Sequence, residues 1–167
     1  MGIDGKTVVF TSGSWDMFHV GHLNILERSK ALGDYLIVGV STDELIQDYK
    51  GMPPVIPYEE RFRIVSAIGC VDKAVKQTIL TEIRQLQEFD VDIVTIGDDW
   101  KNRYLEGLDW MMKQPGKQVV YFEYTPGVST TGIKRNIIKN AYDIIYSELQ
   151  REVQNAESWK KEHEKRP

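Results

Sequence analysis

Short runs of apolar, β-branched residues alternate along this chain with stretches whose apolar residues recur at helical spacing. Four such runs, at residues 8–10, 36–40, 91–96 and 119–122, predict strands that are covered on both faces. Helical patterns occupy residues 22–32, 58–68, 80–89 and 104–113. Strands and helices that alternate in this order are typical of an α/β fold built on a doubly wound parallel sheet.

The chain has 167 residues and a hydrophobic content of 41%, which suits one core rather than two. We predict a single domain over residues 1–140 and a C-terminal helical extension over residues 141–167. A helical pattern runs from Ile133 to about Glu164, and its apolar face comprises Ile138, Ala141, Ile145, Leu149, Val153, Ala156 and Trp159. This helix either packs on its own domain or forms a subunit contact.

Charge and composition exclude several classes of partner. The formal net charge of −4 gives no general attraction to nucleic acid or to an anionic membrane. The basic residues Lys134, Arg135 and Lys139 are not interleaved with aromatic residues as in a nucleic-acid-binding face. No apolar run is long enough to span a membrane, and the single cysteine, Cys70, cannot form an internal disulfide. We therefore expect a cytoplasmic protein with no nucleic-acid or membrane partner.

Polar and glycine residues follow each predicted strand directly. Because ligands of doubly wound sheets bind at the carboxyl ends of the strands, these residues are candidates for a site. They are Thr11, Ser12, Gly13, Ser14, Trp15 and Asp16 after the first strand, Ser41 to Asp43 after the second, Gly97 to Trp100 after the third and Tyr124 to Thr131 after the fourth.

Two histidines, His19 and His22, stand at the start of the first predicted helix with Gly21 between them. Free N–H groups and the positive end of the helix dipole at such a position favour a phosphate group. A metal site is the alternative, but it needs further ligands, and the only other histidine is His163 in the charged tail. We predict a phosphate site and no metal held by the protein.

Residues 13–22 resemble the H-x-G-H signature of the cytidylyltransferase-like nucleotidyltransferases, whose domain is Rossmann-like. Five further segments match that family in order, at residues 26–36, 41–44, 58–61, 97–100 and 127–131. The chain is most similar to the glycerol-3-phosphate cytidylyltransferase branch, over roughly residues 7–140. The resemblance implies a nucleotidyltransferase domain over residues 1–140. It also implies transfer of CMP from CTP to a phosphorylated small alcohol, with release of pyrophosphate. Glycerol 3-phosphate is the first candidate for this acceptor. Mg²⁺ is expected to arrive with the triphosphate, and the protein is expected to be a homodimer.

The same resemblance assigns roles to residues. It makes His19, His22 and Lys50 catalytic, and it places Asp16 and Arg61 at the acceptor substrate. The nucleotide-binding residues that it implies are Thr11, Ser12, Gly13, Ser14, Trp15, Gly21, Asp99, Trp100, Thr125, Gly127, Ser129, Thr130 and Thr131. Ser129, Thr130 and Thr131 precede the last helix and are expected to cap it as well.

Two departures from the cytidylyltransferase pattern leave the nucleotide base open. Tyr124 and Gly69 stand where members of that branch usually carry arginine. Relatives that use ATP also lack one or both arginines, so an adenylyltransferase acting on a sugar phosphate or a flavin stays as the alternative. A non-catalytic nucleotide-binding protein is a third hypothesis, and the presence of His19, His22 and Lys50 speaks against it.

Overall fold

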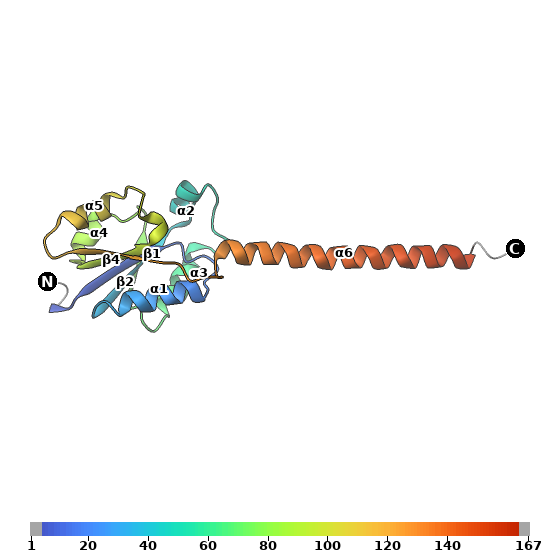
Figure 1. Ribbon diagram of the computed structural model, residues 1–167, viewed down its shortest axis with the longest axis horizontal. Helices are drawn as coiled ribbons and strands as arrows, with labels where there is room; N and C mark the ends of the chain where they lie inside the picture. The colour runs from blue at the N-terminus through green and yellow to red at the C-terminus, as the bar shows by residue number, and fades with distance from the viewer. Residues whose placement is uncertain (1–4, 164–167) are drawn as a thin grey trace. The chain divides into compact units, whose positions relative to one another are not determined.

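The computed structural model of the chain describes residues 5–163 (Figure 1). The outermost residues of both predicted domains, including the expected helix end at Glu164, lie outside the described residues. The chain divides into two compact units between Val128 and Ser129. This division falls before the boundary expected at residue 140, because the last helix already begins at Thr130.

The first unit is built on one parallel sheet of five strands in the order β3-β2-β1-β4-β5. The strands are β1 (Val8–Gly13), β2 (Tyr35–Ser41), β3 (Lys73–Gln77), β4 (Ile93–Gly97) and β5 (Gln118–Phe122). The chain moves outward from β1 through β2 to β3 and then returns to place β4 on the other side of β1. The doubly wound sheet is thereby confirmed, and its topological switch point lies between the carboxyl ends of β1 and β4.

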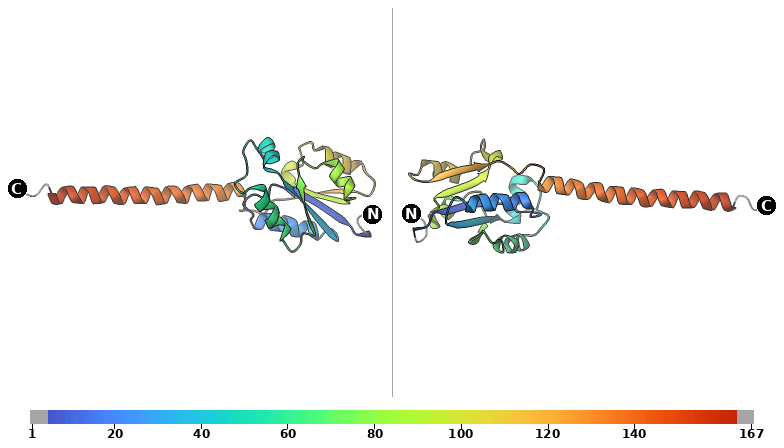
Figure 2. Two further views of the ribbon diagram at one scale, coloured as in Figure 1. Left: turned by 180° about the vertical axis from the view of Figure 1, so that it is seen from behind. Right: turned by 60° about the horizontal axis from the view of Figure 1, so that its bottom comes forward.

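Helices cover both faces of this sheet (Figures 1 and 2). They are α1 (Val20–Lys30), α2 (Asp43–Lys50), α3 (Tyr58–Ser66), α4 (Ile83–Glu88) and α5 (Glu106–Lys113). On one face, Leu26 of α1 and Val65 of α3 pack against Val9, Leu36 and Val38 of the central strands. These apolar side chains are fully buried, which fixes α1, and with it the two histidines, against the sheet.

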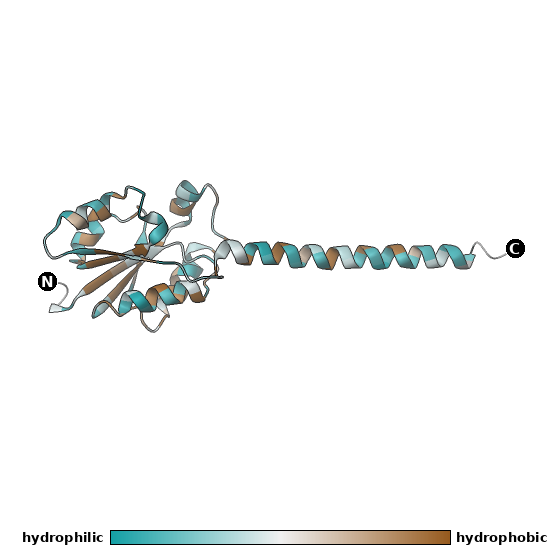
Figure 3. Cartoon of the chain, in the orientation of Figure 1, coloured by the Kyte–Doolittle hydropathy of each residue, from teal (hydrophilic) through white to brown (hydrophobic). Residues whose placement is uncertain are grey.

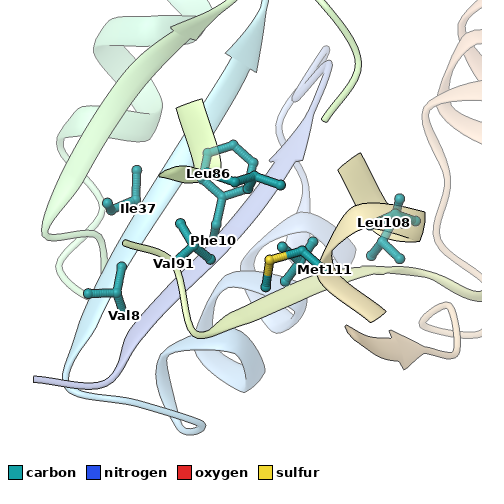
Figure 4. Close-up of a cluster of buried hydrophobic side chains, with 9 residues drawn as sticks. Val8, Phe10, Ile37, Leu86, Val91, Leu108 and Met111 are labelled. Carbon is teal, nitrogen blue, oxygen red and sulfur yellow. The ribbon is translucent and has the colours of Figure 1, made fainter. Parts of the chain in front are cut away.

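The opposite face carries a second apolar cluster (Figure 4). Leu86 of α4 and Met111 of α5 pack over Val8, Phe10 and Ile37 there. Both helices are shorter than their sequence patterns predict, since α4 begins at Ile83 and α5 at Glu106. The two clusters explain why the central strands consist almost entirely of apolar residues.

The second unit is the helix α6 (Thr130–His163). Ser129 caps it, because the Ser129 hydroxyl accepts a hydrogen bond of 3.0 Å from the backbone N–H of Gly132. Thr130 and Thr131 do not precede the helix as expected but form its first two residues. Apolar bands recur along the polar surface of α6 (Figure 3). Among residues 5–163, no helix has both the length and the apolar character needed to cross a membrane.

Candidate active site

The loop that joins β1 to α1 is held in an unusual backbone conformation. Trp15 and Met17 both have positive φ, of 52° and 50°, a region that side chains other than glycine rarely adopt. The buried Trp15 indole compensates by donating a hydrogen bond of 2.9 Å to the carbonyl of Gly39 on β2. Gly13 leaves room for this indole, since a Cβ there would lie 3.2 Å from Trp15 Cε2. The tryptophan thus anchors the loop to the neighbouring strand.

The two histidines lie together at the N-terminus of α1. His19 occupies the position before the helix, and its ring stacks on that of His22 with centroids 3.8 Å apart. Trp15 packs edge-on against His22 at 5.4 Å. Gly21 permits the stack, because a Cβ at that position would lie 3.0 Å from the His19 ring. The spacing H-x-G-H therefore produces one preformed pair of imidazoles rather than two separate side chains.

Both imidazoles are neutral at physiological pH. Burial, followed by repulsion from a protonated His19 and from the Lys50 ammonium, lowers the pKa of His22 to about 3. Burial also lowers the pKa of His19. The buried Nδ1 of His22 has no hydrogen-bond partner among residues 5–163. A neutral imidazole with an unused ring nitrogen can donate a hydrogen bond to a phosphate oxygen without bringing in a full charge.

This low pKa predicts a dependence of stability on pH. Below pH 6.5 the His22 imidazole of the unfolded chain takes up a proton that the folded chain does not bind until about pH 3. The free energy of unfolding should therefore fall by up to about 1.4 kcal/mol per pH unit as the pH drops below 6.5. Urea unfolding from pH 8 to pH 4.5 measures the slope, and His22→Asn should make it shallower. Equal slopes in the two proteins would contradict the assigned pKa.

Lys50 brings a positive charge to the same place from a different element. It is the last residue of α2 and is followed by Gly51 in the left-handed conformation with φ of 76°. Its ammonium donates a hydrogen bond of 3.0 Å to the hydroxyl of Ser14 in the β1–α1 loop. Lys50 and the histidine pair thus lie close to each other beside the β1–α1 loop.

Asp16 is engaged with the chain itself. Its buried carboxylate accepts hydrogen bonds from the backbone N–H groups of Val55 and Ile56, with closest distances of 3.1 and 2.9 Å. These bonds hold the proline-containing loop after α2 next to the β1–α1 loop. A contact between Asp16 and the acceptor substrate stays a prediction.

Arg61 on α3 is fully buried and binds several backbone oxygens. Its guanidinium donates to the carbonyls of Ser14, Ser41 and Ile56 and forms an ion pair of 2.6 Å with Asp43. The arginine thereby ties together the ends of β1 and β2 and the loop after α2. The structure gives Arg61 a positioning role, and its contact with substrate stays a prediction.

Aromatic residues gather where β4 and β5 end. Asp99 and Trp100 belong to the short 3₁₀ helix η2 (Asp98–Trp100). The hydroxyl of Tyr124 donates a hydrogen bond of 3.0 Å to Asp99 Oδ1. Tyr49 of α2 packs edge-on against Trp100 with ring centroids 6.0 Å apart. Burial, followed by the Asp99 charge, raises the pKa of Tyr124, so this phenol remains a donor.

The sequence did not identify Tyr49 as a site residue, and it identified Tyr124 as a strand-end candidate and as the position of a missing arginine without assigning it a partner. A tyrosine in an amphipathic helix such as α2 carries no signal that distinguishes a site residue from a core residue. The contact with Trp100 arises only when α2 and η2 are brought together by the fold.

Several other residues predicted to bind nucleotide form hydrogen bonds within the protein or belong to the second unit. Thr11 is buried and donates a hydrogen bond of 3.1 Å to the carbonyl of Thr95. Thr125 accepts one of 3.0 Å from Asn24 of α1, and Gly127 has a φ of 76° in the turn that follows. Ser12 follows Thr11 at the end of β1. Ser129, Thr130 and Thr131 belong to the second unit, so their nucleotide contacts stay predictions.

Comparison with known proteins places this site in a family. The family model described as cytidylyltransferase-like matches residues 10–140. Glycerol-3-phosphate cytidylyltransferase from Bacillus spizizenii is 40% identical over 131 residues, which make up 77% of this chain and 95% of that protein. The bifunctional protein HldE from Syntrophotalea carbinolica is 35% identical over 135 residues, or 80% of this chain but only 27% of that longer protein.

A solved structure shares the architecture. The lipopolysaccharide core biosynthesis protein from Thermoplasma volcanium superposes with a TM-score of 0.58 and 27% sequence identity, covering 72% of this chain and 98% of that one. The matched family region contains the sheet except the first two residues of β1, together with the histidine pair, Lys50 and Asp99. The chain therefore belongs to the cytidylyltransferase-like family and is a nucleotidyltransferase.

Proposed function

We propose that this enzyme transfers CMP from CTP to a phosphorylated small alcohol, with glycerol 3-phosphate as the first candidate, and releases pyrophosphate. The observation that carries the proposal is the stacked pair of His19 and His22 at the N-terminus of α1, with Lys50 brought toward it by Ser14. The 40% identity to a glycerol-3-phosphate cytidylyltransferase supports the choice of base and acceptor.

The proposed reaction needs no covalent intermediate with the enzyme. A phosphate oxygen of the acceptor attacks the α-phosphorus of the triphosphate, and the bond from the α-phosphorus to the oxygen that bridges to the β-phosphate breaks. That bridging oxygen leaves with the pyrophosphate, so the new bond joins the two phosphorus atoms through the acceptor's oxygen. Catalysis then consists of positioning the reactants and stabilising negative charge.

Each group at the site has a distinct part in this scheme. The neutral rings of His19 and His22 donate hydrogen bonds to phosphate oxygens, while the N-terminus of α1 contributes its positive dipole end. Lys50 supplies a full positive charge near the departing pyrophosphate. Binding of an anionic triphosphate raises the pKa of a nearby imidazole, so each histidine can also become more cationic as charge develops.

Mg²⁺ in this proposal is bound mainly by the triphosphate and by water. Within residues 5–163, no group of three or more histidine, cysteine, aspartate or glutamate side chains is arranged to hold a metal ion. Asp99 is proposed to assist through its Oδ2, because the hydrogen bond from Tyr124 goes to its Oδ1. When Mg²⁺ is bound, it offsets part of the negative charge of the phosphates. His19, His22 and Lys50 then orient the phosphate groups.

The metal proposal predicts that activity is lost in EDTA and returns when Mg²⁺ is added in excess. Since the ion arrives with the nucleotide, the protein purified without nucleotide should contain far less than one equivalent of any divalent metal. Elemental analysis of the purified protein measures this content. A stoichiometric zinc ion that survives EDTA would contradict the proposal.

An ATP-dependent adenylyltransferase acting on a sugar phosphate or a flavin is the second candidate. One observation favours it: Tyr124, hydrogen-bonded to Asp99, stands where the cytidylyltransferase branch usually has an arginine.

One assay separates the two candidates. The purified protein is incubated with Mg²⁺, each of the four nucleoside triphosphates and a panel of phosphorylated alcohols, sugars and flavin mononucleotide, while pyrophosphate release is followed. Turnover with CTP and glycerol 3-phosphate alone supports the proposal. Turnover with ATP alone replaces it with the second candidate, and no turnover with any pair contradicts both.

A further inference from the structure

The helix α6 extends past the part of the chain that the family accounts for. The family model ends at residue 140, and α6 continues to His163. Large apolar side chains along one side of α6 are more than half exposed, namely Ile138, Tyr142, Ile145, Leu149, Val153 and Trp159. Helical stability in proteins comes mainly from packing an apolar face, so an exposed stripe of this length marks an interaction surface.

We propose that α6 pairs with α6 of a second copy of this chain, in antiparallel orientation, along a stripe formed by Ile138, Tyr142, Ile145, Leu149 and Val153. The inference is independent of the substrates proposed above. It depends on the spacing of the apolar residues and on the distribution of charge along α6.

The spacing of the stripe suits a symmetric antiparallel pair. With about 100° of rotation per residue, the five side chains lie within about 80° of arc, which is narrow enough to face one partner helix. When Ile138 is placed opposite Val153 of the second copy, Tyr142 falls opposite Leu149, and the two copies of Ile145 lie within about 1.5 Å of the same level along the helix axis. Every layer of the contact is then apolar, and the twofold axis passes close to Ile145.

Charge selects the antiparallel orientation. Residues 134–139 carry Lys134, Arg135 and Lys139 and no acidic residue, whereas residues 152–157 carry Glu152 and Glu157 and no basic residue. The register described above brings these two segments side by side, so opposite charges meet at both ends of the stripe. A parallel pair would place each segment beside its own copy, where like charges repel.

The first experiment measures the oligomeric state by sedimentation of the full chain. We expect a dimer at micromolar concentration, and Ile145→Glu should halve the sedimenting mass because two carboxylates would meet at the twofold axis. Ile144→Glu is the matched control, since Ile144 is also exposed but lies about 100° around the helix from Ile145. Thermal unfolding of the first unit shows whether each variant is folded.

Three outcomes of this experiment would overturn the proposal. They are a monomeric full chain, a dimer that Ile145→Glu leaves intact, and equal loss of the dimer in both variants. A monomer would indicate that α6 packs on its own domain or remains solvated. A dimer unaffected by Ile145→Glu would place the interface elsewhere.

The second experiment tests orientation by disulfide cross-linking in a Cys70→Ser background. The double variant Ile138→Cys/Val153→Cys should cross-link two chains rapidly, because these positions face each other in the antiparallel pair. Ile138→Cys alone should not, since the two copies of residue 138 are about 22 Å apart in that register. Rapid cross-linking of the single variant would show a parallel pair and overturn the antiparallel geometry.

Discussion

Replacing His22 by alanine should lower the turnover number by a factor of order 10² or more and leave triphosphate binding nearly unchanged. The neutral His22 ring stacks on His19, and its buried Nδ1 has no hydrogen-bond partner among residues 5–163. In the proposed mechanism this ring donates a hydrogen bond to a phosphate oxygen of the triphosphate. Negative charge on that oxygen grows toward the transition state, so the lost hydrogen bond matters more there than in the bound ground state. Single-turnover kinetics measures the chemical step, and calorimetric titration with the triphosphate measures binding.

His163→Ala provides the matched control, since His163 lies in α6 and stacks on Trp159. It should leave the turnover number unchanged. His19→Ala should resemble His22→Ala, and the double variant should lose less than the product of the two single effects, because the stacked rings act as one unit. Near-normal turnover in either single variant would remove that histidine from the proposed mechanism.

Most of the sheet could be predicted from the sequence because its central strands are covered on both faces. Such strands read as continuous runs of valine, leucine and isoleucine. The edge strand β3 has the sequence Lys-Ala-Val-Lys-Gln and is only partly buried. It therefore contains no continuous apolar run from which a strand could be predicted. The pairing of β3 with β2 depends on backbone hydrogen bonds, which the side chains do not reveal.

The short helix α2 was also missed, although its beginning carries a readable signal. Thr42 caps it, and its hydroxyl accepts a hydrogen bond of 3.2 Å from the backbone N–H of Leu45. Asp43 and Glu44 follow in the first turn, as the helix dipole favours. The eight residues of α2 contain few apolar side chains, so the periodicity on which the prediction relied was too weak.

The candidate site could be predicted where its residues are neighbours in the sequence. His19 immediately precedes α1, and Gly21 and His22 lie in its first turn, so the sequence already indicates that the two rings are close together. The contact between Tyr124 and Asp99 joins residues 25 positions apart, and that between Tyr49 and Trp100 joins residues from α2 and η2. Such pairs are set by how the strands are ordered in the sheet, which local patterns do not specify.

Arg61 is the clearest case of a role that the sequence could not reveal. An arginine on the first turn of a helix usually extends into solvent, and the resemblance suggested a substrate phosphate as its partner. In the structure its guanidinium is fully buried. It donates hydrogen bonds to backbone carbonyls of three separate segments, at Ser14, Ser41 and Ile56. The carbonyls that surround Arg61 belong to the same loops that position Lys50 and the histidine pair.

Arg61→Ala should therefore destabilise the first unit by about 3–5 kcal/mol, because it leaves the buried carbonyl of Ser41, the part-buried carbonyls of two loop residues and the Asp43 carboxylate without their donor. Arg61→Lys should recover only part of this loss, since one ammonium cannot reproduce the planar fork that reaches three segments. Arg63→Ala on the same helix is the control, because Arg63 is exposed and its removal should change stability by less than about 0.5 kcal/mol. Urea unfolding measures all three differences. If Arg61→Ala unfolds at the same urea concentration as the control but no longer turns over, the arginine contacts the substrate and does not hold the loops.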